Sequence, residues 1–360
     1  MTGSLARAPL RVVCCMRMGE DNLRNHITPL ALHPEVGSVT IMRRNLLKHS
    51  DIPKVLMLVP YAGSRVLSLS LLWCVLMLFP LRHRVSLFVS FNPVPYGLMA
   101  LIAAKLWRKP VHLGFVGSDW YKSLKGWLGY VLMPLLRCAD FFTCTGTQMR
   151  DEMIGCGFPA DRIKVLPHSI DLDKARIGNP SKAQYDCIFI GNLIERKRVD
   201  TLMRAMALVT TSHPQARLCI VGEGHLHTSL EQLAVQLDVR HNVDFAGQST
   251  DVFSYLQRSR ISIIASNMEG FPFATVEAMC CGLVPVCTPV GTIPNYITHG
   301  ETGMLFPVGD HQALANCILR LLDNPELYTR IRTNVLALRE QFSYERATAV
   351  WDRFLTACMR

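Results

Sequence analysis

The stretch that decides the fold runs Ile261-Ser262-Ile263-Ile264-Ala265-Ser266-Asn267-Met268-Glu269-Gly270-Phe271-Pro272-Phe273-Ala274-Thr275-Val276-Glu277. Its branched apolar start predicts a buried strand, Gly-Phe-Pro-Phe predicts a turn, and residues 274–281 predict a helix that Gly282 ends. In such a unit Glu269 lies on the loop after the strand and Glu277 in the first turn of the helix. Helix amides beside two carboxylates suit a ligand with both phosphate and sugar hydroxyls. A first-turn glutamate also complements the helix dipole without a ligand. The neighbouring motifs must therefore decide whether Glu277 contacts a ligand.

Length and composition indicate a globular chain of two domains. The chain has 360 residues, of which 49% are hydrophobic and 18% charged, and this excludes a disordered protein. Its 13 cysteines lie mostly in apolar runs, which predicts reduced thiols in a reducing compartment. His225 and His227 come closest to the spacing of metal ligands, and no structural metal is expected.

Positive charge is concentrated in the first half of the chain. Residues 1–170 hold 20 Lys+Arg and 9 Asp+Glu, whereas the remainder holds 18 and 19. A nucleic acid, an anionic membrane surface or an acidic substrate could each attract such a half. Nucleic acid ranks lowest because no aromatic residues alternate with basic ones as in single-strand binders.

The first half has the pattern of a parallel α/β sheet. Leu10–Cys15 is too short for a signal peptide and predicts the first strand. A helix is expected at Tyr96–Trp107. Further strands are expected at Val39–Met42, Lys54–Val59, Val85–Ser90 and Val111–Val116.

Two apolar segments of this half have more than one interpretation. Val66–Leu81, flanked by Arg65 and by Arg82-His83-Arg84, predicts first a core helix and second a helix lying on an anionic membrane surface. Trp120–Leu136 mixes aromatic residues with lysines, which favours a membrane surface or an acceptor groove. Asp119, after a predicted strand, faces a cleft or caps the next helix.

The second half begins a new sheet. We place the domains at residues 1–170 and 171–341, and expect the helix in 342–360 to pack back toward the first domain. A strand at Cys187–Ile190 ends at Gly191-Asn192. Arg196, Lys197 and Arg198 follow, before a helix at Asp200–Leu208, and form either a diphosphate clamp or a solvated charge run.

Later segments repeat the strand–turn–helix form. Gly222-Glu223-Gly224 follows the strand at Leu218–Val221 without the third glycine of a dinucleotide fingerprint, so a nicotinamide site is poorly supported. Further elements are expected at Val243–Gly247, Val284–Cys287, His311–Leu322 and Tyr344–Cys358.

Five ordered segments together resemble the retaining, nucleotide-sugar-dependent glycosyltransferases of family 4. The resemblance implies the GT-B fold, an α/β architecture of two Rossmann-like parallel-sheet domains that face each other. The specific segments are Val165–Asp171, Gly191–Lys197, Val221–Gly224, Glu269–Gly282 and Gly300–Pro307. Looser matches in the first half are Leu10–Gly19, Asn92-Pro93, Gly117–Asp119 and Ala139-Asp140.

The resemblance also implies roles for individual residues. Glu269 would contact the donor hexose, Glu277 the ribose hydroxyls and Lys197 the diphosphate. Backbone amides of Phe271, Phe273 and Ala274 would lie near the sugar and the distal phosphate. Further donor contacts are expected at Gly19, Asn192, Gly222, Gly224, Gly270 and Thr275.

Departures from the family pattern bear on catalysis. Asn192 stands where the family usually has arginine, and Arg196 is the candidate to replace it. Gly117-Ser118-Asp119 replaces a histidine often found in the acceptor domain, which leaves the role of Asp119 open. The catalytic candidates are therefore Glu269, Lys197, Arg196 and Asp119.

A mechanism follows from charge. Breaking the bond between anomeric carbon and phosphate puts negative charge on a nucleoside diphosphate, which Lys197 and Arg196 would stabilise. In a front-face displacement the departing phosphate oxygen can take the acceptor's proton, so no side-chain base is required. A metal is also dispensable when lysine and arginine neutralise the diphosphate.

The predicted function is transfer of a hexose from a UDP- or GDP-sugar to a lipid-linked or polysaccharide acceptor in cell-envelope glycan synthesis. The donor is a substrate, and no cofactor is expected. The enzyme would be cytoplasmic and peripheral at the inner face of the cell membrane. Alternatives are a nucleotide-sugar epimerase on the same fold, or a non-catalytic partner subunit, which the departure at Asn192 favours.

Overall fold

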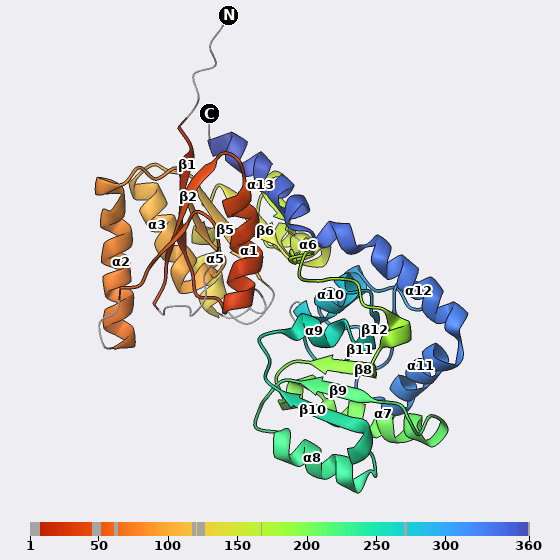
Figure 1. Ribbon diagram of the computed structural model, residues 1–360. Helices are drawn as coiled ribbons and strands as arrows, with labels where there is room; N and C mark the ends of the chain where they lie inside the picture. Colours follow the sequence, from red (N-terminus) through yellow and green to blue (C-terminus); the bar gives the residue numbers. More distant parts are fainter. Residues whose placement is uncertain are drawn as a thin grey trace, which may run out of the picture. The chain divides into compact units, whose positions relative to one another are not determined.

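The chain forms two compact units, one of residues 1–169 with 344–360 and one of residues 170–343. A computed structural model describes residues 8–44, 52–60, 64–116, 120, 127–166, 168–269 and 272–358. Within these residues each unit contains one parallel sheet, of seven strands in the first and six in the second. Helices pack on the sheets (Figure 1). The predicted α/β fold of two Rossmann-like domains is confirmed.

The first unit has the strand order β3-β2-β1-β4-β5-β6-β7. Its strands are β1 Leu10–Cys15, β2 Val36–Met42, β3 Val55–Leu58, β4 Leu87–Ser90, β5 Val111–Phe115, β6 Phe141–Cys144 and β7 Ile163–Val165. Its helices are α1 Glu20–Leu32, α2 Arg65–Arg82, α3 Leu98–Leu106, α5 Trp127–Leu136, α6 Thr147–Gly155 and α13 Tyr344–Cys358. The central strands are almost fully apolar because helices cover both faces of a parallel sheet.

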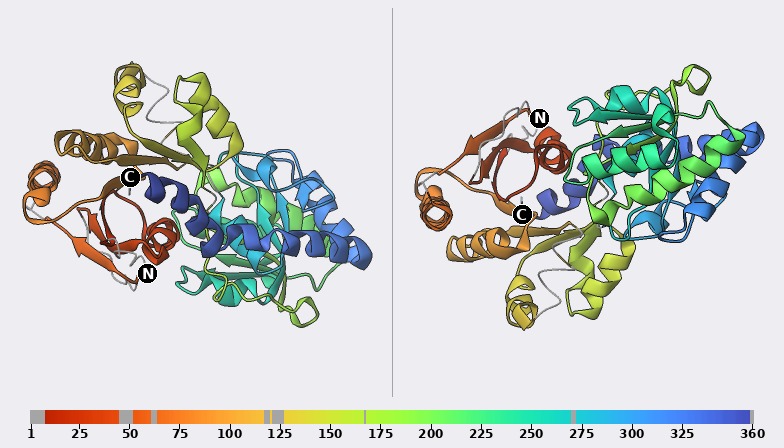
Figure 2. Two further views of the ribbon diagram at one scale, coloured as in Figure 1. Left: turned by 90° about the horizontal axis from the view of Figure 1, so that it is seen from above. Right: turned by 90° about the horizontal axis from the view of Figure 1, so that it is seen from below.

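The C-terminal helix α13 belongs to the first unit. Trp351, Phe354 and Leu355 of α13 are buried, and the helix lies against α1 (Figure 2). Trp351 also contacts the ring of His112 in β5, at 4.8 Å between centroids. The last residues of the chain thus complete a core that begins at residue 10.

The second unit has the strand order β10-β9-β8-β11-β12-β13. Its strands are β8 Tyr185–Ile190, β9 Leu218–Val221, β10 Val243–Gly247, β11 Ser259–Ile264, β12 Val284–Cys287 and β13 Met304–Leu305. Its helices are α7 Val199–Ser212, α8 His227–Gln236, α9 Val252–Leu256, α10 Phe273–Cys280, α11 His311–Asp323 and α12 Pro325–Ala337. α12 had not been predicted, and it begins because the Asn324 side chain accepts a hydrogen bond from the Leu327 amide at 2.9 Å.

The prediction that Val66–Leu81 forms a buried core helix is wrong. The segment is helical, but only 17% of α2 is buried. Ser68, Leu72 and Leu76 face inward, whereas the opposite face is apolar and exposed. An all-round apolar helix is normally buried, yet here a single stripe packs and the rest is left at the surface. By length and composition alone α2 could also cross a membrane.

The sequence suggested that Trp120 belongs to a membrane-facing aromatic surface. The structure shows that it does not. Its ring is 1% exposed and packs against Phe115 and Phe158. Its indole N–H donates to Glu152 Oε2 at 2.8 Å, which satisfies the one polar atom of the buried ring. Tyr130, on α5, is by contrast 89% exposed.

Candidate functional site

The candidate site lies where two neighbouring strands of the second sheet end. β8 and β11 pair in parallel, although the helices α7, α8 and α9 and the strands β9 and β10 separate them in sequence. The loops that follow them therefore leave the same edge of the sheet, at the point where the strand order reverses. The amide of Asn267 donates to the Arg196 carbonyl at 3.0 Å and joins the two loops.

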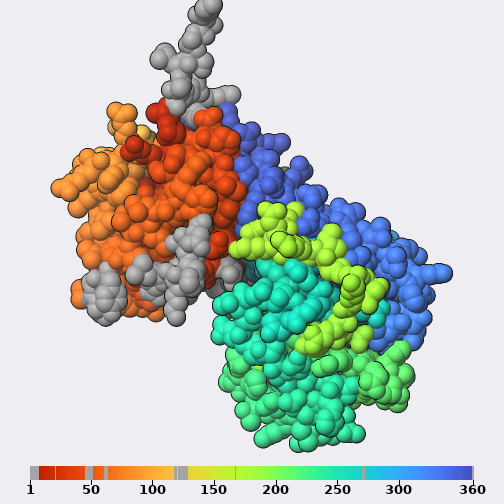
Figure 3. Space-filling model, in the orientation of Figure 1, coloured from red at the N-terminus to blue at the C-terminus, as the bar shows by residue number. Residues whose placement is uncertain are grey.

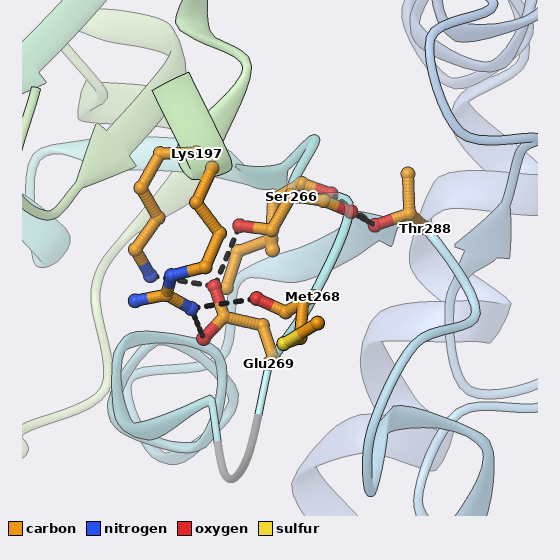
Figure 4. A network of polar contacts seen from close by, with 7 residues as sticks. Lys197, Ser266, Met268, Glu269 and Thr288 are labelled. Atoms are coloured by element: carbon orange, nitrogen blue, oxygen red, sulfur yellow. Dashed lines mark hydrogen bonds and ion pairs between the residues drawn. The ribbon is translucent and has the colours of Figure 1, made fainter. Parts of the chain in front are cut away.

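Glu269 is the centre of a polar network at this edge (Figure 4). Its Oε1 accepts hydrogen bonds from Lys197 Nζ and from Ser266 Oγ, each at 2.6 Å. Its Oε2 accepts from Arg196 Nη1 at 3.2 Å, and the same Nη1 donates to the Met268 carbonyl at 2.6 Å. Two cations from the loop after β8 thus hold one carboxylate from the loop after β11.

The charges of this network are largely out of water. The side chain of Glu269 is 6% exposed and that of Lys197 15%, while Arg196 keeps 40% of its surface. A carboxylate offers about four acceptor positions, of which three are used here. A lysine ammonium has three donors, and one points at Glu269. Counting the described residues alone, Glu269 retains one acceptor position and Lys197 retains donors for a ligand at this edge.

Sequence reasoning missed the residues that position Glu269. Ser266 is fully buried, and its carbonyl accepts a hydrogen bond from Thr288 Oγ1 at 2.6 Å. Thr288 follows β12, the next strand in the sheet, so the network spans three strand ends. The signal for Ser266 in the sequence was its position three residues before Glu269. This spacing brings the two side chains together only in the backbone conformation that the loop adopts.

The three consecutive cations do not act together. Arg196 and Lys197 point toward Glu269, but Arg198 binds Asp200 with two hydrogen bonds of 3.0 and 3.1 Å. Arg198 adopts a left-handed conformation, with φ of 48°, which turns its side chain away from its neighbours. The predicted clamp is therefore reduced to two cations. Asn192 is exposed at the start of the same loop.

Gly222 and Gly224 join the loop after β9 to the loop after β8. A Cβ on Gly222 would lie 1.9 Å from the Gly191 carbonyl oxygen, and one on Gly224 would lie 2.3 Å from that of Leu193. The Leu193 amide donates to the Glu223 carbonyl at 2.9 Å across this contact. Packing between two backbones explains both glycines here.

Glu277 lies in the second turn of α10, not in the first as predicted. The helix begins at Phe273, one residue earlier than expected, after Pro272. Glu277 is half-buried, and Thr275 is buried at 2% exposure. The amides of Thr275 and Val276 donate to the Pro272 carbonyl, at 3.0 and 3.3 Å. Phe273 and Ala274 form the start of the helix, where the backbone dipole is positive.

The remaining predicted site residues lie elsewhere. Gly19 precedes α1 in the first unit, with φ of −62°, a value that does not require glycine. Asp119, Gly270 and Phe271 fall outside the described residues. His225 and His227 pair with Glu195 and Glu223, respectively. Among the residues that the structure describes, no three His, Cys, Asp or Glu side chains gather as around a metal ion.

Two sequence families match the chain, one in each half. Residues 8–168 match the Glycosyl transferase 4-like domain, and residues 172–336 match Glycosyl transferases group 1. N-acetyl-alpha-D-glucosaminyl L-malate synthase of Bacillus anthracis is 32% identical over 173 residues, covering 48% of this chain and 45% of the relative. Amylovoran biosynthesis glycosyltransferase AmsK of Erwinia amylovora is 28% identical over 180 residues, covering 47% and 44%. The chain thus spans about half the length of these curated relatives.

The fold resembles solved structures over nearly the full chain. HepE of Anabaena in complex with UDP has a TM-score of 0.80 at 19% identity, covering 97% of this chain and 100% of that one. The same protein in complex with UDP-glucose has a TM-score of 0.77. These likenesses confirm the GT-B fold.

Proposed function

The chain belongs to family 4 of the glycosyltransferases, and from that premise we propose that it transfers a hexose from a nucleotide sugar to an acceptor with retention of configuration. The donor is a UDP- or GDP-sugar, and the acceptor is lipid-linked or a polysaccharide of the cell envelope. The observation that carries the proposal is the arrangement of Lys197, Arg196 and Glu269 at the carboxyl edge of the second sheet.

This arrangement supports a site for a phosphorylated sugar. Lys197 and Arg196 supply cations for a diphosphate, and Glu269 keeps an acceptor position for a sugar hydroxyl. The start of α10 adds the positive end of a helix dipole after the Glu269 loop. UDP and UDP-glucose are the ligands of the HepE complexes, which supports a nucleotide-sugar donor.

In the proposed reaction the bond between the anomeric carbon and the phosphate oxygen breaks, and the acceptor oxygen forms a bond to that carbon on the same face. The acceptor's hydroxyl proton passes to the departing phosphate oxygen. Lys197 and Arg196 stabilise the charge that develops on the nucleoside diphosphate. Their positive charge serves the purpose that a metal ion serves in other transferases.

Donor binding tests the site. We expect calorimetry against UDP-, GDP- and ADP-sugars to find one ligand that binds, and Glu277→Gln to weaken that ligand by about tenfold, because a charged acceptor of ribose hydroxyls is lost. Glu301→Gln, at an exposed turn of the same unit, serves as the matched control. Equal affinity of Glu277→Gln and the unmodified protein would refute the ribose assignment.

Product stereochemistry tests the reaction. With the donor identified, NMR of the product should show the anomeric configuration of the donor. An inverted product would exclude the front-face displacement. Epimerised sugar formed without acceptor would instead establish the epimerase, and saturating donor that is neither hydrolysed nor transferred would establish a non-catalytic subunit.

We also propose that α2 binds an anionic membrane surface from the cytoplasmic side. Leu67, Leu71, Cys74, Leu78 and Leu81 are exposed, and their spacing of four, three, four and three residues puts them on one face of the helix. Arg65 precedes this stripe, and exposed Arg82 and Arg84 follow it. Apolar residues that enter the headgroup region between cations are the features of a helix lying in a membrane surface. The surface of this part of the chain is drawn in orange in Figure 3.

Vesicle flotation tests this proposal. The protein should float with phosphatidylglycerol vesicles, less so with phosphatidylcholine, and salt should weaken the binding because it screens the arginines. Leu71→Glu with Leu78→Glu should abolish flotation, whereas Val235→Glu, on α8 and 64% exposed, should not. Equal flotation of both variants, or none by the unmodified protein at low salt, would remove α2 as the membrane contact.

A further inference from the structure

Arg43 is a buried cation at the carboxyl end of β2. It follows β2, is 5% exposed, and its amide donates to the Leu58 carbonyl of β3 at 3.1 Å. Within the described residues, its Nε and Nη1 have no hydrogen-bond partner. A buried guanidinium is costly unless its donors are satisfied, so this side chain is in place for a group that supplies acceptors.

Two more polar groups lie at the same sheet edge. Arg17 follows β1, is exposed, and is held by a 2.6 Å hydrogen bond from its amide to Asn92 Oδ1. Tyr96, 5% exposed, lies in the turn after β4. β2, β1 and β4 are neighbours in the sheet, and the strand order reverses between β1 and β4. Ligands of open α/β sheets bind at such a reversal.

Charge at this edge is mostly positive. Arg17, Arg43 and Arg44 act electrostatically on the Tyr96 phenol, and they oppose the rise in its pKa that burial causes. Burial lowers the pKa of Arg43, and the carboxylate of Glu20 opposes that change. Glu20 is the first residue of α1, the helix that follows β1.

We propose that Arg43, Arg17 and Tyr96 form a binding site for a phosphate group. The guanidinium of Arg43 offers N–H donors at Nε and Nη1 to phosphate oxygens. Among the described side chains, the positive charges of Arg43 and Arg17 favour a dianion over a monoanion. The inference rests on the proposed function for its role: the phosphate belongs to the acceptor, in a unit separate from the donor residues Lys197 and Glu269.

Calorimetry with inorganic phosphate on the full chain tests this site. Saturating UDP or GDP, whichever binds, is present throughout so that phosphate cannot occupy the donor site. The unmodified protein should bind phosphate, and Arg43→Gln should lower the affinity for phosphate by tenfold or more. Arg43→Lys should fall between them because it keeps the charge but loses the planar set of guanidinium donors. Arg11→Gln, an exposed arginine at the opposite end of β1, should bind as the unmodified protein does.

A second arm distinguishes the source of the phosphate. If the acceptor phosphate is a soluble ester, glycerol 3-phosphate should compete with inorganic phosphate and show the same loss in Arg43→Gln. If it is a lipid headgroup, phosphatidic acid vesicles should compete, and Arg43→Gln should remove that competition. Either result supports the phosphate site.

Equal phosphate affinity in the unmodified protein and Arg43→Gln, or no binding by the former, overturns the inference. If Arg43→Gln fails to fold, Arg17→Gln and Arg43→Lys decide, and the inference is overturned when neither weakens phosphate. If no nucleotide binds but phosphate binding depends on Arg43, the proposed function fails and the anion site stands.

Discussion

At the scale of single residues, Glu269 shows why a buried charge needs fixed partners. A carboxylate that is 6% exposed cannot rely on water, and a buried ion that loses its partner costs about 3–5 kcal/mol. Lys197, Arg196 and Ser266 provide those partners. These groups of the protein itself hold the carboxylate and the ammonium in place.

A double-mutant cycle measures the pair in solution. Lys197→Gln and Glu269→Gln should each destabilise the second unit, because each leaves the other charge buried with one partner fewer. The double variant should be less destabilised than the sum, with a coupling of about 1–3 kcal/mol in the free energy of unfolding. Urea unfolding followed by circular dichroism provides the measurement. The exposed pair of Arg240 with Glu231, in the same unit, is the control, with an expected coupling below about 1 kcal/mol.

Gly222 permits a second prediction at this scale. Gly222→Ala would place a methyl group 1.9 Å from the Gly191 carbonyl oxygen, on a backbone with φ of 147°. Overpacking and strain together predict a loss of about 3 kcal/mol. Gly155→Ala, at the end of α6 with nothing within 4 Å of the added carbon, should change thermal unfolding little. Equal melting temperatures for both variants would show that the two loops are not packed so closely.

At the scale of elements, local pattern and tertiary context contribute differently. Strands such as Leu10–Cys15 and Val243–Gly247 were predictable to the residue because branched apolar runs between turns have few other interpretations. The exposed face of α2 was not predictable, since an all-round apolar helix does not show which side will find a partner. The contact of Lys197 with Glu269 depends on β8 and β11 becoming neighbours, which sheet order decides and local sequence does not.

Helix α13 and strand β5 meet around buried histidines, which predicts a response to pH. Burial lowers the pKa of His26 to about 4 and that of His112 to about 3, from 6.5. Between about pH 6.5 and pH 4 these histidines therefore bind protons in the unfolded chain, whereas they stay neutral in the folded unit. The contribution of each histidine to the free energy of unfolding is complete above pH 6.5. Below that pH it falls by about 1.4 kcal/mol for each pH unit.

Tryptophan fluorescence can follow this loss. All five tryptophans lie in residues 1–169 or 344–360, so their emission reports the first unit alone. Urea midpoints should fall between pH 7 and pH 4.5, and His112→Gln should reduce the slope by about one proton. His213→Gln, in the second unit, should leave it unchanged. A midpoint independent of pH would mean that these histidines are already accessible to protons.

At the scale of the whole molecule, the two units differ in chain connectivity. The second unit is one continuous segment, residues 170–343, whereas the first needs α13 from the far end of the chain. Trp351, Phe354 and Leu355 together fill a core with β1 and α1. Removing one buried aromatic residue costs about 3–5 kcal/mol, and a whole domain is stable by only about 5–15 kcal/mol.

We therefore expect only one of the two units to fold when its long segment is expressed alone. Residues 170–343 expressed alone should fold, judged by a cooperative thermal transition, because every strand and helix of the second sheet lies within them. Residues 1–169 alone should lack such a transition, since the loss of α13 exceeds the stability of a typical domain. Adding a peptide of residues 344–360 should restore folding, and a peptide with Trp351→Ala and Phe354→Ala should not. A cooperative transition of residues 1–169 without the peptide would show that α13 covers the core without being required for it.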